Sequence, residues 1–151
     1  MCAVKVGKLA KVTVGTWVTQ GTYVVAEQGT YSLSGFSRDA LDSTSFGDDV
    51  KEYTFGLGDA GEVTFSGNYD PTADAAFNAV SPQEYLRSCC SNGLTMTSGH
   101  LRFYIDSTSY MTVGGAGTLL LTKVHAIGFD KAGIGTISFT AKVSGGAIVT
   151  V

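Results

Sequence analysis

Apolar and polar side chains alternate along much of the chain, and this period of two predicts β-strands. The clearest case is residues 62–69, where Val63, Phe65 and Tyr69 share one face and polar side chains occupy the other. Residues 136–144 show the same alternation. Shorter runs of this kind lie at residues 4–6, 12–14, 23–26 and 101–105, and a longer apolar run covers residues 118–129. We expect each of these segments to form a strand.

One helix is expected between these strands. Ser81 is suited to the N-cap, Pro82 to the first helical position, and Glu84 completes a capping box. The Asn92-Gly93 pair provides a stop signal. Four side chains would face the core at helical spacing: Tyr85, Leu86, Cys89 and Cys90. A short alanine-rich stretch before this helix, at residues 72–80, is also compatible with helix.

The alternation is lost between the strands predicted at 23–26 and 62–69, where glycines, serines and acidic residues dominate. We therefore expect a long loop at about residues 32–61, and ordered loops of this length are usually functional. The segment does not resemble a disordered acidic tail, because Leu41, Val50, Tyr53 and Phe55 interrupt the acidic residues.

The composition agrees with a mainly β chain. Among 151 residues there are 20 glycines and 2 prolines, and only 15% of the residues are charged, against roughly 25% in an average globular domain. Together with the strand pattern, this predicts a single domain over residues 1–151. We expect a β-sandwich or open barrel of two packed sheets, with one flanking α-helix and the long loop.

The charge is unevenly distributed along the chain. The net charge of −3 argues against a generic basic nucleic-acid binder. Residues 38–74 carry nine acidic and two basic residues, whereas the segments on either side each have a net charge of +2. Copies of such a domain could stack with complementary potentials. A solvated acidic loop is the simpler interpretation when this feature is taken alone.

No arrangement of side chains predicts catalysis, a cofactor or a metal. His100 and His125 have no second histidine or carboxylate at ligand spacing, and the three cysteines, Cys2, Cys89 and Cys90, fit neither a disulfide framework nor a metal knuckle. The glycine-rich residues 114–117 lack the Lys-Ser/Thr ending of a phosphate-binding loop. We therefore expect a protein that is not an enzyme and whose thiols stay reduced.

The sequence also gives no membrane signal. No apolar run approaches the roughly 18 residues that a membrane span needs. The N-terminal residues, MCAVKVGKLAKVTVG, lack the apolar centre of a signal peptide. We expect synthesis in the cytoplasm and no membrane partner.

Residues 35–79, GFSRDALDSTSFGDDVKEYTFGLGDAGEVTFSGNYDPTADAAFNA, contain four motifs in a fixed order. They are Ser-Arg-Asp-x-Leu-Asp-x-Thr at 37–44, an aromatic-rich tract at 53–57, Asp-Ala-Gly-Glu-Val at 59–63 and Asn-Tyr-x-Pro at 68–71. In this order they resemble the central region of siphophage tail tube proteins. A looser similarity covers residues 101–105 and the closing strand TISFTAKVSG.

The resemblance implies a sandwich-like domain that forms hexameric rings, which stack into a tube for genome delivery. It implies that strands of neighbouring subunits continue one sheet around the lumen and that the long loop contacts the adjacent ring. The interface residues suggested in this loop are Arg38, Asp39, Asp42, Ser43, Thr44, Glu52 and Tyr53. A loop that packs only on its own domain is the alternative.

By the same resemblance, the partners are further copies of the chain, the tail terminator, tape measure and distal tail proteins, and double-stranded DNA that passes without specific binding. The location would be the tail tube of a virion made in the cytoplasm of a bacterial host. Two other assemblies are compatible with a self-associating β domain: the tube ring of a secretion system and a capsid decoration protein. A small enzyme or ligand-binding module would need a nucleophile, base or metal cluster, which the sequence does not provide.

Overall fold

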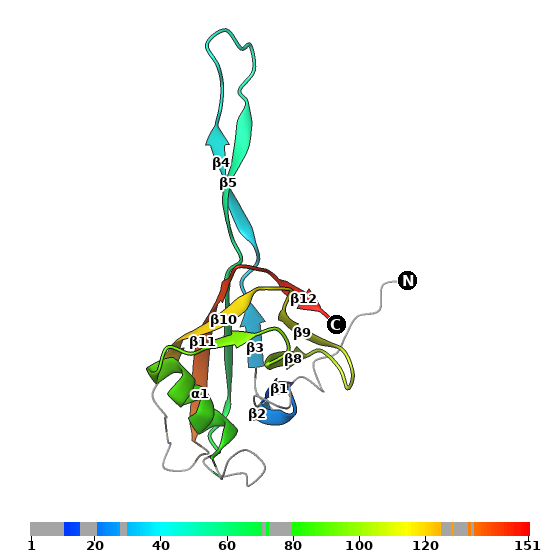
Figure 1. The fold of residues 1–151 in the computed structure, drawn as a ribbon, viewed down its shortest axis with the longest axis vertical. Helices are drawn as coiled ribbons and strands as arrows, with labels where there is room; N and C mark the ends of the chain where they lie inside the picture. Colours follow the sequence, from blue (N-terminus) through cyan, green and yellow to red (C-terminus); the bar gives the residue numbers. More distant parts are fainter. Residues whose placement is uncertain are drawn as a thin grey trace.

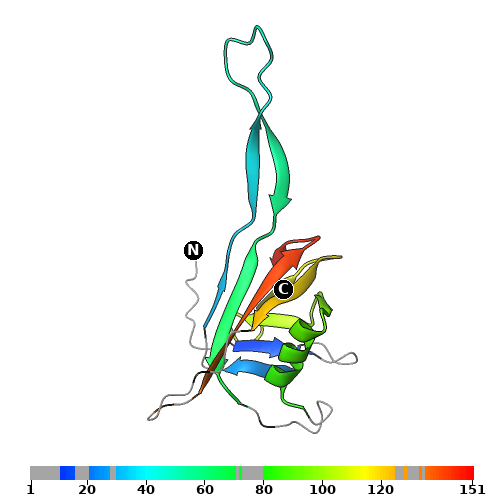
Figure 2. The ribbon, with the colours of Figure 1, turned by 90° about the vertical axis from the view of Figure 1, so that its left-hand side faces the viewer.

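Two five-stranded antiparallel sheets pack face to face, and a two-stranded hairpin projects far from one of them (Figures 1 and 2). The computed structural model describes residues 11–15, 21–27, 30–70, 72, 80–124, 128, 133 and 135–151. The strand orders are β12-β9-β8-β1-β2 in the first sheet and β3-β6-β11-β10-β7 in the second. The predicted fold class, a mainly β sandwich with a flanking helix, is confirmed.

The first sheet is built from short strands. They are β1 (Lys11–Val14), β2 (Tyr23–Glu27), β8 (Leu101–Tyr104), β9 (Tyr110–Val113) and β12 (Ile148–Thr150). The strands predicted at 12–14, 23–26 and 101–105 are confirmed as β1, β2 and β8, whereas β9 and β12 were not predicted. The strand predicted at residues 4–6 lies outside the described residues.

The second sheet contains the two longest alternating segments as neighbours. Its strands are β3 (Thr30–Leu33), β6 (Glu62–Asn68), β7 (Thr95–Thr97), β10 (Thr118–Val124) and β11 (Thr136–Ser144). β6 pairs with β11 in a continuous register from Glu62↔Lys142 to Asn68↔Thr136, and with β3 on its other side. The strands predicted at 62–69 and 136–144 are confirmed. The apolar run at 118–129 forms β10 up to Val124, and much of its remainder lies outside the described residues.

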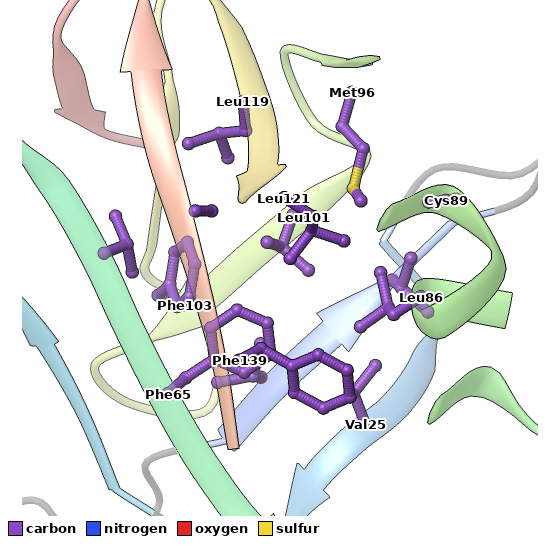
Figure 3. Close-up of a cluster of buried hydrophobic side chains, with 14 of the residues drawn as sticks. Val25, Phe65, Leu86, Cys89, Met96, Leu101, Phe103, Leu119, Leu121 and Phe139 are labelled. Atoms are coloured by element: carbon purple, nitrogen blue, oxygen red, sulfur yellow. The ribbon is translucent and has the colours of Figure 1, made fainter. Parts of the chain in front are cut away.

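The core between the sheets centres on three phenylalanines (Figure 3). The Phe65 ring stacks on that of Phe139, with 5.1 Å between centroids, and meets the Phe103 ring edge-on at 5.6 Å. Since Phe65 and Phe139 belong to the second sheet and Phe103 to the first, these rings join the two layers. Offset and edge-on pairs of this kind add roughly 0.5–1.5 kcal/mol to the free energy of burying the rings.

The predicted helix is α1 (Pro82–Ser91), which packs against β2 and β10. As predicted, Ser81 caps it by accepting a hydrogen bond from the backbone N–H of Glu84 (3.1 Å), and Asn92 and Gly93 end it. The Glu84 carboxylate, however, accepts hydrogen bonds from Arg87 and Tyr69, where a complete capping box would turn it to Ser81. The helix predicted at 72–80 falls largely on residues outside the described part.

The inward face of α1 is as predicted. Leu86 and Cys89 are buried in the core, and Tyr85 and Cys90 are half-buried and pack against it. Gln83 is buried as well, and its amide donates to the carbonyls of Val25 (2.8 Å) and Asn68 (2.7 Å). Its oxygen accepts from the N–H of Asp70 (2.9 Å). This one polar side chain therefore joins α1 to both sheets.

The prediction of a long irregular loop at about residues 32–61 was wrong in its secondary structure. Residues 32 and 33 complete β3, and the segment then forms β4 (Ser37–Asp42) and β5 (Tyr53–Asp59), which pair with each other. The alternation that marks a half-buried strand is missing because both faces of this hairpin are exposed. Whether the segment lies between subunits is a separate question, taken up below.

Candidate assembly interface

The hairpin, which we call the arm (residues 36–59), extends away from the sandwich in the direction of the strands that carry it (Figure 2). β3 leads into β4, and β5 leads into β6, so the arm continues two neighbouring strands of the second sheet. A two-stranded ribbon by itself is marginally stable in water. The arm is therefore a feature whose order needs an explanation.

The arm exposes an unusual amount of apolar surface. Seven of the twelve exposed large hydrophobic side chains in the described part of the chain belong to it: Phe36, Leu41, Phe46, Val50, Tyr53, Phe55 and Leu57. Phe46 and Leu57 are fully exposed, at 111% and 97% of their reference areas. Monomeric proteins rarely gather so many exposed apolar groups without a partner.

Both faces of the arm carry such groups. Residues opposite each other in an antiparallel pair share a face, which places Phe55 beside Ala40 and Tyr53 beside Asp42. The other face carries Leu41 opposite Thr54. A surface that covered only one face would leave apolar side chains of the other in water. The arm is thus suited to insertion between two surfaces.

The turn at the far end, which we call the tip (residues 43–52), is closed by its own hydrogen bonds. The Ser43 N–H donates to the Glu52 carbonyl (2.9 Å), and the Glu52 N–H donates to the Thr44 hydroxyl oxygen (3.0 Å). The hydroxyl and N–H of Thr44 both donate to the Asp42 carboxylate, and these bonds lower the pKa of Asp42. The tip is therefore ordered without help from the sandwich.

The base of the arm is fixed to the sandwich by polar contacts. Lys142 Nζ, on β11, lies 2.9 Å from each carboxylate oxygen of Asp59, and the hydrogen bond from Lys142 lowers the pKa of Asp59. The Ser34 N–H donates to the Glu62 carbonyl (2.9 Å), and the Glu62 N–H donates to the Ser34 hydroxyl oxygen (2.7 Å). Gly61, between these contacts, has a φ of +82°.

A cleft of about 550 Å³ opens beside this base. Its walls come from the arm, through Phe36, Arg38 and Leu57, and from β11 with the turn that follows it, through Lys142 and Ser144. Glycines contribute to its lining from both sides: Gly58, Gly145 and Gly146. We call this space the basal cleft.

The histidine and cysteine side chains that the structure describes are those of His100, Cys89 and Cys90. Among the described residues, no three His, Cys, Asp or Glu side chains lie close enough to hold a metal ion. His100 is half-buried, and its Nδ1 lies 3.1 Å from the Thr97 hydroxyl. Burial raises the pKa of the Cys89 thiol, which disfavours the reactive thiolate. No helix in the described part is long and apolar enough to span a membrane.

Solved structures share this architecture. A chain from the tail of an empty gene transfer agent particle, refined with helical and C6 symmetry, gives a TM-score of 0.61 at 16% identity, over 98% of this chain and 99% of that one. A chain from the sheath–tube complex of an extracellular contractile injection system gives 0.62 at 12% identity, over 95% and 88%. A chain from the tube-terminating cap of the anti-feeding prophage gives 0.63 at 12% identity, over 100% and 93%.

The chain has the tail tube fold. No protein-family model and no curated protein sequence matches it. The likeness covers nearly the whole of both chains. The fold implied by the siphophage motifs is therefore confirmed.

On this fold, all seven interface residues suggested by the sequence lie on the arm. Arg38, Asp39 and Asp42 belong to β4, and Tyr53 begins β5 opposite Asp42. Ser43, Thr44 and Glu52 belong to the tip, where their backbone and hydroxyl groups close the turn. Arg38 lies near the base, with its guanidinium 5.3 Å from the centre of the Phe36 ring.

The sequence-based list was incomplete in its apolar members. It omitted six apolar side chains of the arm that are each more than half exposed: Phe36, Leu41, Phe46, Val50, Phe55 and Leu57. The signal was present in the sequence as aromatic and aliphatic residues inside an acidic segment. Their exposure could not be foreseen while the segment was expected to be an irregular loop.

Proposed function

We propose that this chain is the repeating subunit of a tail tube, in which hexameric rings stack to form a channel for genome delivery. The observation that carries the proposal is the arm, whose two faces expose apolar side chains that its own sandwich does not cover. Contacts with neighbouring copies would remove this surface from water and stabilise the tube by the hydrophobic effect. The tail tube fold supports the same conclusion.

The sheet edges support assembly as well. In the described part of the chain, β3 and β7 are the outer strands of the second sheet, and β2 and β12 are those of the first. Edge strands present unpaired N–H and carbonyl groups that invite pairing with another chain. Pairing between copies in a closed ring would satisfy these groups without open-ended aggregation. We infer that one of the sheets continues from copy to copy around the lumen.

The other partners follow from the role of a tube. We infer contacts with a tail terminator, a tape measure protein and a distal tail protein, and passage of double-stranded DNA without specific binding. The tube-terminating cap and the C6 symmetry among the similar structures support the terminator and the hexamer. The location would be the tail of a virion produced in the host cytoplasm, and the role would be structural, not enzymatic.

An arm-deletion variant tests the proposal. Leu33 of β3 lies opposite Val63 of β6, so residues 35–60 can be replaced by Asn-Gly to join the two strands in a short hairpin. We expect the full chain to form hollow tubes or stacked rings in negative-stain electron microscopy. The deletion variant should remain a monomer that is folded, as shown by cooperative thermal unfolding followed by far-ultraviolet circular dichroism.

The outcomes separate clearly. A full chain that stays monomeric at high concentration would refute the proposed function. A folded deletion variant that still forms tubes would leave the proposed tube function standing. It would refute the role of the arm in holding the tube together.

A second candidate is the tube of a contractile injection device that carries no genome. It is favoured by the similarity to a sheath–tube complex and to a tube-terminating cap of such systems. Particles purified from producing cells distinguish the two. Copurification of the chain with nuclease-protected double-stranded DNA supports the virion, and particles without nucleic acid support the injection device.

A further inference from the structure

The basal cleft is shaped to receive a large apolar side chain. Phe36 and Leu57 provide apolar walls, and Gly58, Gly145 and Gly146 bring bare backbone to its surface. Its charged lining consists of Arg38, Lys142 and Asp59, which leaves a formal excess of one positive charge. The cleft is therefore both apolar and mildly basic.

The positive charge available in the cleft belongs to Arg38. Lys142 is already paired with Asp59. The Arg38 guanidinium stacks on the Phe36 ring, and within the described part of the chain it forms no hydrogen bond or ion pair. A guanidinium offers a fork of N–H donors that matches a carboxylate. The cleft thus presents an unused site for an acidic group next to its apolar walls.

The tip has the complementary properties. Phe46 projects from it with its whole side chain exposed, and Val50 is exposed at 76%. Three acidic residues, Asp48, Asp49 and Glu52, accompany a single cation there, Lys51. The carboxylates of Asp49 and Glu52 have no partner among the described residues. The internal hydrogen bonds of the tip hold this arrangement before any contact forms, which lowers the entropic cost of docking.

We propose that the tip of one copy docks in the basal cleft of another, with Phe46 between the apolar walls and an acidic side chain of the tip on Arg38. The cleft is lined by residues at the base of the arm. The tip lies at the far end of the arm (Figure 1), so no copy fills its own cleft. The contact joins two different surfaces, and such head-to-tail contacts generate rings or open helical stacks. This inference rests on the proposed tube and names the surface that the arm engages.

Cysteine cross-linking tests the contact directly. One copy carries Phe46→Cys and a second carries Ser144→Cys, which lies in the cleft wall and is exposed. Both have Cys2 and Cys90 replaced by serine and keep the buried Cys89. After mixing, assembly and mild oxidation, we expect a disulfide-linked pair of the two copies. The matched control pairs Phe46→Cys with Ser88→Cys, on the exposed face of α1, and should give no such pair.

The cross-link separates this inference from the proposed function. Tubes that form without a link between positions 46 and 144, or that link positions 46 and 88 equally well, would overturn the docking and leave the tube intact. If the unaltered chain forms tubes or rings and the mixture forms none, the altered tip or cleft is needed for assembly. The assembly of the Phe46→Ser variant alone is then compared with that of the mixture. An unaltered chain that never assembles would overturn both.

Charge exchange provides an independent readout. Arg38→Glu makes the cleft acidic, and Asp49→Arg combined with Glu52→Arg makes the tip basic, so each variant alone should repel its own copies and lose assembly. When the two variants are mixed, the tip of each variant has a charge opposite to that of the other variant's cleft. We expect the mixture to recover at least half of the tube yield of the unaltered chain. A mixture that assembles no better than either variant alone would contradict the pairing of the tip with the cleft.

Discussion

Lys142 of β11 and Asp59 at the end of β5 form an ion pair, with Nζ 2.9 Å from both carboxylate oxygens. The pair joins the sandwich to the arm across 83 positions of sequence. Asp59 also accepts a hydrogen bond from the Gly61 N–H (2.8 Å), so one carboxylate fixes both the turn and the direction of the arm at its base.

The first prediction concerns the titration of this carboxylate. The hydrogen bond from Lys142 lowers the pKa of Asp59 below its ordinary value of 3.8, so the contribution of this pair to stability is present above that value. It is lost as the pH falls through the lowered pKa. Lys142→Met should raise the pKa of Asp59, as measured by the pH dependence of its carboxyl carbon shift in NMR. Asp42, whose pKa is lowered by Thr44, is the internal control and should not move.

The second prediction concerns the buried amide of Gln83. Gln83→Met keeps the length of the side chain but leaves the Val25 and Asn68 carbonyls and the Asp70 N–H without its hydrogen bonds. We expect a loss of about 1–3 kcal/mol in the free energy of unfolding. Urea denaturation measures it, with Leu41→Met on the exposed arm as a control that should stay within about 0.5 kcal/mol. Equal stability of the two variants would show that water replaces the amide.

The third prediction compares two glycines with positive φ. Gly93→Ala, at φ +63° with open space around it, should cost about 1–2 kcal/mol for the left-handed backbone alone. At Gly61, φ +82°, a Cβ would also lie 2.5 Å from the Ser34 carbonyl oxygen. Gly61→Ala should therefore be the more destabilising of the two in thermal unfolding, and it should reduce tube formation. Similar losses of stability for both variants would indicate that the base of the arm shifts freely to accommodate the added Cβ.

The fourth prediction uses one residue type in two environments. Phe65→Ala removes a ring that is 1% exposed and packed between two others, and should cost about 3–5 kcal/mol of unfolding free energy. Phe55→Ala removes a ring that is 78% exposed on the arm and should leave the unfolding free energy of the monomer within about 0.5 kcal/mol. Light scattering should nevertheless show weaker assembly for Phe55→Ala. Normal assembly of the Phe55→Ala variant would show that the Phe55 ring is not part of the interface.

The sequence predicted the elements in which one face is buried and the other is exposed. β6 and β11 bury every second side chain, so their alternation was visible, and the Ser81 cap and Gly93 stop of α1 each satisfy a local requirement of the backbone. β9 (YMTV) and β12 (IVT) were missed because apolar residues stand next to each other in them and do not alternate with polar ones. Gln83 was missed because a buried amide cannot be distinguished from an exposed one by spacing.

The arm shows the limit of such reasoning for the candidate site. The motifs at 37–44 and 53–57 mark the segment that we propose as the interface, but its hairpin has no inward face that would produce a pattern. The basal cleft unites Phe36 with Ser144, residues 108 positions apart, and only the folded chain brings them together. The ion pair between Asp59 and Lys142 is non-local for the same reason.

The continuity of β5 with β6 has a mechanical consequence. β6 is hydrogen-bonded along its whole length to β11 on one side and, over residues 63–66, to β3 on the other. A pull on the arm along the strand axis loads both ladders in shear, so many hydrogen bonds resist together and none is peeled open singly (Figure 2). Tension applied to one copy through its arm would pass into the centre of the second sheet, the most heavily bonded layer of the domain.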